Sequence, residues 1–390
     1  MWLLDVLICF LILMFGINFK KKFKGLNLRD KKILDYLFYF HTLVGVIFYF
    51  YIIGRGDAVY YWMRTKELTL NVLWYNLLNQ GHASDFIYFF NYLFSNTLDL
   101  SFFTGSILYT VLGYIGLVYF YLILKKIVPN YHYLRKLKIL NISVFPFFLF
   151  FPNLHFWSCG VGKDTLLFLC VALFIYSLIE LKKNIGNLSL SILLSVFVRP
   201  HMTIFLIAGF GIGYTLSSNI TTYKKVIMSS VFVFAFFLLF DYALNFIQLE
   251  SVDTSSIKEY ADTKAKVLSS KSNSGVDISG YPYPLKILTY LYRPFFFDIN
   301  NPIAVIASFE NLFLLLLTLK IFKFKNIRHI KQASHIIKGS IVFLLIGTLT
   351  FSLILGNLGI MLREKNMFTP VFIIVAYWLL SVSKLNQKQN

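Results

Sequence analysis

Short groups of polar residues lie at the ends of long apolar stretches, and they are the parts of the chain that could do chemistry. The first group is Gly54-Arg55-Gly56-Asp57, which follows an apolar run. A carboxylate at a membrane surface can take a proton from an acceptor hydroxyl or orient a phosphate through a cation. Asp57 is therefore a candidate general base, and Arg55 is a candidate substrate ligand. The alternative is a helix-end turn closed by a local ion pair.

The second group begins at His155 and ends in Gly162-Lys163-Asp164. The Gly-Lys pair resembles a phosphate loop, but such a loop needs glycine where Trp157 stands and Ser or Thr where Asp164 stands. Nucleotide binding is therefore excluded. Lys163 and Trp157 are candidate substrate ligands, and His155 is a second candidate base. Asp164 either joins these ligands or caps the next helix, and a purely structural turn is the alternative.

The third group is Arg199-Pro200-His201. Proline removes a backbone donor and unwinds a helix, so an arginine and an imidazole are presented here at membrane depth. Ionisable residues at that depth are functional candidates by default. We predict that Arg199 binds substrate, and His201 is a further candidate base. The alternative for Arg199 is a side chain that only reaches up to the membrane surface.

Two more arginines and one glutamate complete the set. Arg293 stands before an apolar run and Arg363 at a turn between two others, and both are predicted to bind substrate. Glu310 and its neighbour Asn311 lie inside an apolar stretch, which indicates a buried partner. For Glu310 a structural hydrogen bond and a functional role are both open.

The composition places these groups in a membrane protein. Of the 390 residues, 57% are hydrophobic and only 14% are charged, whereas soluble domains have about a quarter charged residues. The net charge of +19 would suggest nucleic acid in a soluble protein, but the cations lie in short clusters between apolar runs, so no nucleic-acid partner is expected. The three cysteines, Cys9, Cys159 and Cys170, have no metal-ligand spacing. No metal or cofactor is therefore predicted.

The apolar runs predict an all-α bundle of about 11 transmembrane spans, forming one integral membrane domain over 1–390. Cytoplasmic connections should be rich in Lys and Arg, and on this rule 24 of the 37 cations fall inside. The N-terminus is then outside, the first segment is retained, and the C-terminus is cytoplasmic. The expected spans are near 2–19, 33–54, 102–124, 139–152, 165–181, 188–198, 201–218, 226–244, 301–322, 341–360 and 367–384.

The arginines do not follow the lysines. Five of the eight arginines fall on the side that topology should deplete of cations. A guanidinium binds phosphate or carboxylate through two parallel hydrogen bonds, which lysine cannot do. The outer arginines therefore indicate anion recognition, and they are Arg55, Arg64, Arg199, Arg293 and Arg363.

Two long outer segments, 55–101 and 245–300, should pack against the spans. Apolar residues recur at helical spacing between Thr69 and Gln80, with two aromatic residues among them, which predicts an interfacial helix. The stretch from Ser251 to Ser279 is rich in Ser, Asp and Lys, so we expect a mobile loop there.

Several of these motifs together resemble a known family. They are Gly-Asp-Ala-x-Tyr at Gly56, His-x-Trp at His155, Gly-x-Gly-Lys-Asp at Gly160, Arg-Pro-His at Arg199, Arg-Pro-Phe at Arg293 and Asn-x-Gly-x-x-x-Arg at Asn357. Their arrangement is similar to that of the bacterial polysaccharide polymerases, the Wzy-type or EpsG-like membrane proteins of O-antigen, capsule and exopolysaccharide pathways. The chain departs from that pattern at Phe210, where a glycine is expected.

The resemblance implies a glycosyltransferase that joins undecaprenyl-diphosphate-linked repeat units at the outer face of the bacterial cytoplasmic membrane. A chain-length regulator and a flippase of the same pathway would be its partners, beside the membrane lipids. Arg199, Arg293 and Arg363, with Lys163, would hold the departing diphosphate, and fixed cations can do so without a metal. Asp57, or else His155 or His201, would take the acceptor proton.

Two other functions fit the sequence. One is a glycosyltransferase that uses a polyprenyl-monophosphate sugar, which also needs an outer carboxylate near a membrane junction. The other is a flippase or transporter of lipid-linked sugars. Transport predicts cations along a path through the membrane, whereas the predicted topology collects them at one face.

Overall fold

The computed structural model describes residues 2–54, 56–79, 83–217, 220–247, 254–270, 274–322 and 327–387. These parts are almost entirely helical, as the all-α prediction required, and their strands are limited to the short antiparallel pair β1–β2. The chain divides into two compact units. Unit 1 contains Met1–Ile123 and Leu149–Pro200, and unit 2 contains Leu124–Phe148 and His201–Asn390.

Unit 1 is built around α2, α6 and α9. Helix α9 is apolar on all sides and almost wholly buried, as expected for a helix without a polar face. Hydrogen bonds from Tyr114 to the carbonyl of Leu34 and from Tyr121 to Asp30 tie α6 to α2. Its elements are α1 (Trp2–Phe19), η1 (Lys20–Lys22), α2 (Leu28–Ile52), α3 (Asp57–Glu67), α4 (Leu70–Asn79), α5 (Ala83–Tyr92), η2 (Leu93–Thr97), α6 (Phe102–Ile127, whose last turn belongs to unit 2), η4 (Phe148–Phe150), α8 (Pro152–Phe156), α9 (Lys163–Ile179), η5 (Leu181–Lys183) and α10 (Ile185–Val198).

Unit 2 packs α14, α15, α17 and α19 against one another. The backbones of α11 and α17 meet closely where two glycines face each other: a Cβ on Gly213 would lie 2.2 Å from the nitrogen of Gly339. Its elements are η3 (Tyr131–Arg135), β1 (Lys138–Ile139), β2 (Ile142–Ser143), α7 (Val144–Phe147), α11 (Pro200–Thr215), α12 (Thr222–Ile247), α13 (Thr254–Ser270), α14 (Tyr283–Tyr292), η6 (Phe296–Asp298), α15 (Pro302–Ile321), η7 (Arg328–Gln332), α17 (His335–Ile354), α18 (Leu358–Lys365) and α19 (Thr369–Gln387).

The length and composition of the helices fit a multi-pass membrane protein. Among the described residues, six helices are long and apolar enough to cross a membrane, and they lie in α1, α2, α6, α12, α15 and α17. A seventh span results if α18 and α19, which are bent by 59° at a short break, count as one. Helices α9, α10 and α11 have 17, 14 and 16 residues, short of a full span. The count of about eleven spans therefore stays a prediction.

Two expected segments differ from the structure. The stretch 139–152 is not one continuous helix, since Pro146 and Pro152 divide it into a strand and short helical turns. The polar stretch expected to be a loop contains the helix α13. Ala261 and Ala265 of α13 are buried four residues apart, so a narrow apolar stripe orders this helix despite its polar composition.

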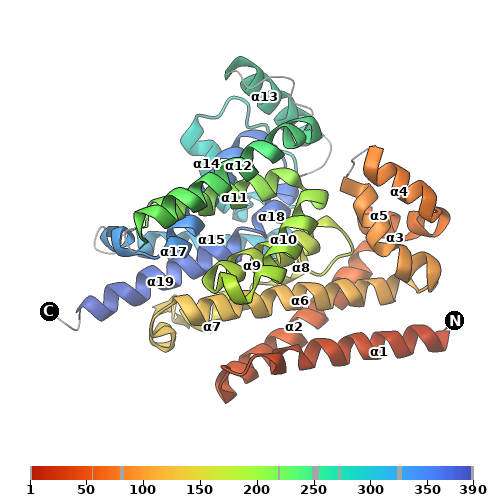
Figure 1. The fold of residues 1–390 in the computed structure, drawn as a ribbon, viewed down its shortest axis with the longest axis horizontal. Coiled ribbons are helices and arrows are strands. Elements are labelled where there is room, and N and C mark those ends of the chain that lie inside the picture. The colour runs from red at the N-terminus through yellow and green to blue at the C-terminus, as the bar shows by residue number, and fades with distance from the viewer. Residues whose placement is uncertain are drawn as a thin grey trace. The chain divides into compact units, whose positions relative to one another are not determined.

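The segment that follows α2, which is predicted to lie outside, forms a small helical group in unit 1. Helices α3, α4 and α5 lie side by side in Figure 1, with α5 in contact with both of the others. Helix α4 matches the helix predicted between Thr69 and Gln80. Its exposed Trp74, Tyr75 and Leu78 are the side chains that an interfacial helix would present to lipid, and that location stays a prediction.

Candidate functional site

An ion pair joins the two helix ends that carry the second and third predicted groups. Helix α10 ends at Val198, and the next residue, Arg199, is its C-cap. Asp164 lies in the first turn of α9, and its Oδ1 is 3.2 Å from a terminal nitrogen of Arg199. The two side chains are only 14% and 12% exposed. Because α9 and α10 pack along each other, this pair holds a guanidinium at one end of the helix pair.

The sequence had allowed Asp164 to cap α9, but the structure shows that it does not. The N-cap is Gly162, whose φ of +145° is available to glycine at little cost. The conformation turns the chain so that Lys163 starts the helix, with its Nζ 5.6 Å from the centroid of the Tyr61 ring. A cation over an aromatic face is attracted to the ring. Lys163 is thereby held against α3.

Helix α3 also carries Asp57, which is its first residue and is exposed. Asp57 and Tyr61 are four residues apart, so their side chains lie on the same face of the helix, about one turn from each other. Gly56 caps this helix with a φ of +86°, a conformation that glycine adopts at little cost. Arg55, the other ligand predicted in this group, lies outside the described residues.

Unit 1 therefore contains four of the predicted residues, which two contacts and one helix face relate to one another. Tyr61 links Asp57, on its own helix, to Lys163, which is followed in the chain by Asp164 and its partner Arg199. We call Asp57, Lys163, Asp164 and Arg199 the charged group of unit 1. A carboxylate can accept a proton, and cations can stabilise an anion that forms in the reaction.

Trp157 belongs to the turn before α9 and is half-buried. Its indole Nε1 is buried, and no hydrogen-bond acceptor lies within reach of it in the described part of the chain. Buried donors without a partner are rare in folded proteins. This donor is consistent with the prediction that Trp157 binds substrate, because a ligand oxygen would accept its hydrogen bond.

His155 is placed differently from the prediction. It is completely buried, with Nδ1 2.9 Å from Nδ1 of His41 and Nε2 2.9 Å from the carbonyl oxygen of Leu149. Burial lowers the pKa of His155 to about 4, so the ring is neutral at neutral pH. If Nε2 donates to Leu149, then Nδ1 accepts from His41, and this tautomer is assigned from the contacts. A ring with no exposed surface and both nitrogens engaged is poorly placed to be the base.

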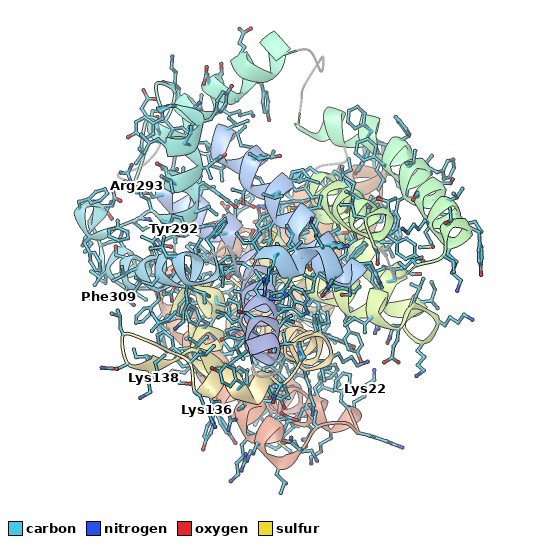
Figure 2. All side chains as sticks on the ribbon, turned by 90° about the vertical axis from the view of Figure 1, so that its left-hand side faces the viewer. Lys22, Lys136, Lys138, Tyr292, Arg293 and Phe309 are labelled. Carbon is cyan, nitrogen blue, oxygen red and sulfur yellow. The ribbon has the colours of Figure 1, made fainter. Side chains whose placement is uncertain are left out.

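In unit 2, Arg293 is already bound through two parallel hydrogen bonds. Its Nε is 2.9 Å from Oδ2 of Asp298, and its NH2 is 2.5 Å from Oδ1. The guanidinium also lies 5.4 Å from the centroid of the Phe297 ring. The hydrogen bonds to Asp298 raise the pKa of Arg293 above its ordinary value. Figure 2 shows Arg293 beside Tyr292 at the end of α14, where it closes the turn toward α15.

A buried lysine that the site prediction omitted supports the same turn. Lys365 is 7% exposed, and its Nζ donates to the carbonyls of Leu291 and Arg293 and to Oδ1 of Asn311, at 3.3, 3.1 and 3.1 Å. Asn311 in turn donates to the carbonyl of Pro294 at 2.8 Å. The polar pair Glu310-Asn311 thus has the buried partner that the sequence indicated. The signal for Lys365 was a cation close to two apolar runs.

The two remaining predicted residues also belong to unit 2. Arg363 is half-buried in the last turn of α18, a helix whose N-cap Asn357 accepts from the amide of Ile360. His201 is the second residue of α11, and its ring centroid is 6.0 Å from that of Phe205 and 6.3 Å from that of Phe351. In the described parts of the chain, no group of three or more His, Cys, Asp or Glu side chains could hold a metal ion.

Comparison with known proteins identified no relative of this chain. No protein-family model matches the chain, and neither a curated protein nor a solved structure is detectably similar to it.

Proposed function

We propose that the chain is a membrane glycosyltransferase that polymerises undecaprenyl-diphosphate-linked oligosaccharide repeat units at the outer face of the bacterial cytoplasmic membrane. The observation that carries the proposal is the charged group of unit 1. Its members occupy helix ends, at the start of α3, the start of α9 and the end of α10. Charged groups at helix ends suit chemistry at a membrane surface.

In the proposed reaction, each member of the charged group of unit 1 has its own role. The acceptor hydroxyl oxygen attacks the anomeric carbon of the donor sugar, the bond from that carbon to the diphosphate oxygen breaks, and the diphosphate leaves with the electron pair. Asp57 takes the proton of the hydroxyl. Arg199 and Lys163 stabilise the charge that develops on the leaving diphosphate. Asp164 orients Arg199 through the ion pair.

This assignment narrows the set of diphosphate ligands taken from the family resemblance. Both prongs of Arg293 are engaged by Asp298, so a diphosphate would have to displace that carboxylate. We therefore give Arg293 the role of holding the turn between α14 and α15. Arg363 remains a candidate ligand.

The test is the length distribution of surface polysaccharide in a strain that lacks the gene and is complemented with variants. The wild type should restore long chains, and Asp57→Asn should leave single repeat units while the protein stays at normal abundance. Asp99→Asn is the matched control, since Asp99 is an exposed carboxylate of unit 1 paired with Lys66 at 2.5 Å. Long chains from Asp57→Asn would show that its carboxylate is not the base.

The two alternatives have their own tests. A transferase that uses polyprenyl-monophosphate sugars would add single sugars when supplied with that donor, and a polymerase would not. Transport is favoured by one observation: Glu310 lies in the middle of α15 and interacts electrostatically with the buried Lys365. Flipping of a fluorescent lipid-linked sugar in proteoliposomes, lost in Glu310→Gln, would establish transport instead of polymerisation.

The proposal also requires the charged group to face outward. Reporter fusions near residues 57, 160, 270 and 363 should report the outside, and fusions within 20–32, 125–138, 323–338 and the C-terminus should report the cytoplasm. A cytoplasmic signal from fusions near residues 57 and 160 would place the group on the wrong side for an outer-face polymerase.

A further inference from the structure

The connection between α1 and α2 gathers positive charge on the surface of unit 1. From Lys20 to Asp35 the chain has seven cations and two carboxylates. Five of the cations are exposed, on η1, in the turn after it and at the start of α2, and Figure 2 labels one of them, Lys22. We call these five the basic patch, and they are Lys21, Lys22, Lys24, Arg29 and Lys32.

The two carboxylates nearest in sequence to the basic patch are engaged by other residues. Asp35 pairs with Lys20, which is buried and does not belong to the patch. Asp30 is also buried, and it accepts hydrogen bonds from the Tyr121 hydroxyl at 2.7 Å and from the amide of Asn27 at 3.0 Å. Among the residues that the structure describes, no carboxylate forms an ion pair with a member of the patch. The patch therefore presents five positive charges to its surroundings.

An exposed stripe on α2 continues from the patch along the helix. Its side chains recur at intervals of three or four residues, which places them on one face. Helix α2 has 25 residues and is long and apolar enough to cross a membrane. An apolar stripe exposed along such a helix is suited to contact with lipid tails. The stripe consists of Leu28, Lys32, Tyr36, Tyr39, Leu43, Ile47 and Phe50.

The tyrosines on this stripe indicate the depth of the patch in a membrane. Tyr36 and Tyr39 are 64% and 58% exposed, and tyrosine is enriched where the hydrocarbon meets the lipid headgroups. Lys32 lies four residues before Tyr36, about 6 Å along the helix at 1.5 Å per residue. With Tyr36 at that boundary, Lys32 lies at the level of the headgroups. Attraction between charges extends over about 8 Å at physiological salt, so the patch is within reach of lipid phosphates.

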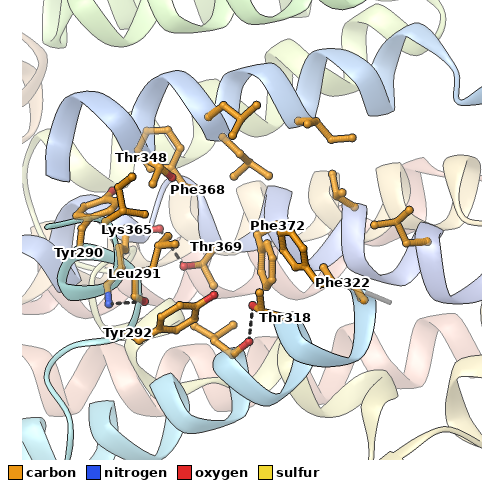
Figure 3. Close-up of a pocket in the computed structure, with 18 of the residues that line it drawn as sticks. Tyr290, Leu291, Tyr292, Thr318, Phe322, Thr348, Lys365, Phe368, Thr369 and Phe372 are labelled. Atoms are coloured by element: carbon orange, nitrogen blue, oxygen red, sulfur yellow. Dashed lines mark hydrogen bonds between the residues drawn. The ribbon is translucent and has the colours of Figure 1, made fainter. Parts of the chain in front are cut away.

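An apolar slot in unit 2 differs from the patch in its charge. It has a volume of about 410 Å³ and lies between α14, α15, α17 and α19, and leucine, isoleucine and phenylalanine predominate in its lining. Figure 3 shows Tyr290 and Lys365 together at one end of the slot. Lys365 already donates to three oxygens, and the carboxylates that act on these two residues are Glu310 and Glu364. The slot therefore lacks the uncompensated cations that would select an anionic headgroup.

We propose that the basic patch binds the headgroups of anionic phospholipids, in the leaflet that the predicted topology makes cytoplasmic. The positive-inside rule explains on which side these cations lie, but Lys20, buried and paired with Asp35, satisfies that rule equally well. The rule does not require five exposed cations at the end of a lipid-facing stripe. An acidic protein would match the charge, but the stripe continues the patch into the hydrocarbon, which favours lipid. The proposal does not depend on the polymerase reaction.

The experiment is photolabelling of the purified protein in phosphatidylcholine nanodiscs. One probe is phosphatidylglycerol and the other is phosphatidylcholine, each with a diazirine at the same position close to the headgroup. Labelled peptides are identified by mass spectrometry. The phosphatidylglycerol probe should label residues 19–36 about tenfold more strongly, because each cation near an anionic surface strengthens the attraction about fivefold. High salt should reduce the difference between the probes.

A matched pair of variants then locates the site. Lys21→Gln/Lys22→Gln removes two adjacent lysines of η1 and should reduce phosphatidylglycerol labelling of residues 19–36 about five- to tenfold. The control is Lys182→Gln/Lys183→Gln, which removes two adjacent exposed lysines of η5, also in unit 1 and also predicted cytoplasmic. Lys183 already pairs with Glu180 at 3.0 Å, so the control should keep the labelling of the wild type.

Three results would overturn the assignment. Equal labelling of residues 19–36 by the two probes in the wild-type protein would mean that the patch does not select anionic lipid, as expected if its partner is an acidic protein. This comparison needs no variant, so it does not depend on the folding of any mutant. Phosphatidylglycerol labelling that is unchanged in Lys21→Gln/Lys22→Gln, or that falls equally in the control, would place the lipid elsewhere.

Discussion

Arg199 in unit 1 and Arg293 in unit 2 both stand at the end of a helix, but their guanidinium groups make different contacts. Each is the C-cap of its helix, and each is followed by proline. Arg293 grips Asp298, five residues on, through both prongs. Arg199 contacts Asp164 at 3.2 Å through one terminal nitrogen, across 35 residues of chain. A fork closed within its own turn holds that turn, whereas a guanidinium paired across two helices joins the charged group at their ends.

The residues around the two arginines also differ. Lys365 and Asn311 fix the main chain on either side of Arg293. Beside Arg199 lies the charged side chain of Asp164, at the start of α9. The comparison predicts that changes in the Arg293 region act on stability and changes in the Arg199 region act on turnover.

The largest effect should come from Lys365→Met. The change removes the donor to two main-chain carbonyls and to Asn311, and it removes the buried cation on which Glu310 acts. Breaking a buried charge interaction costs about 3 to 5 kcal/mol of stability. Thermal unfolding in detergent measures it. Lys66→Met, which breaks a more exposed pair with Asp99, should cost less than about 1 kcal/mol. Equal stability of the two variants would contradict a structural role for Lys365.

The second effect concerns turnover at Arg199. Lysine keeps the charge but loses the fork, and a hydrogen bond to a charged group is worth about 1.5 to 3 kcal/mol. Arg199→Lys should therefore reduce polymer synthesis by about 10- to 100-fold, with normal protein abundance. Alanine should be worse than lysine. The chain-length ladder, read beside the protein level, gives the result, and normal long chains from Arg199→Lys would remove this residue from the mechanism.

The third effect is a dependence of stability on pH through His155. Its pKa is about 4 in the folded protein and about 6.5 in the unfolded chain. Between these values the unfolded chain binds more protons, so stability is full above pH 6.5 and falls as the pH drops. Between pH 7.5 and 5 the loss should be about 2 kcal/mol. Unfolding temperatures at both pH values measure it, and His155→Gln should have a flatter profile. An equally steep profile in that variant would assign the effect to other groups.

The smallest effect is expected for Arg293→Lys. One of the two hydrogen bonds to Asp298 is lost, but the charge remains and Arg293 is partly exposed, so stability should fall by about 1.5 kcal/mol, the low end for a hydrogen bond to a charged group. Turnover per folded molecule should stay close to that of the wild type. A loss of turnover as large as that of Arg199→Lys would mean that a diphosphate displaces Asp298, and the distinction between the two arginines would fail.

The sequence allowed the helical class and the chemistry-bearing residues to be predicted, because both depend on local patterns. Apolar length indicates membrane helices, and Gly and Pro mark the turns near residues 56, 162 and 200. The sequence could not show which distant residues contact one another. The contact between Arg199 and Asp164 requires the exact packing of α9 on α10, and the contact of His155 with His41 joins residues 114 positions apart.

Average composition also misled in two places. Helix α13 was expected to be a loop because its stripe of buried small residues is too narrow to raise its mean hydropathy. The expected span at 139–152 has enough apolar residues, but its prolines prevent one continuous helix. Lys365 was not predicted as a site residue, because its burial depends on partners from α14 and α15 that no local sequence pattern shows.

The interleaving of the two units along the chain has a consequence for how the protein is made. Residues 124–148 belong to unit 2, although unit 1 continues after them to Pro200. This segment accepts hydrogen bonds from Tyr377, through Val144, and from Ser381, through Pro129. Those partners leave the ribosome more than 200 residues later, on the order of ten to fifty seconds at ordinary synthesis rates. During that interval the segment lacks these two hydrogen-bond donors, so loss of the C-terminal helix is expected to affect residues 124–148 as well.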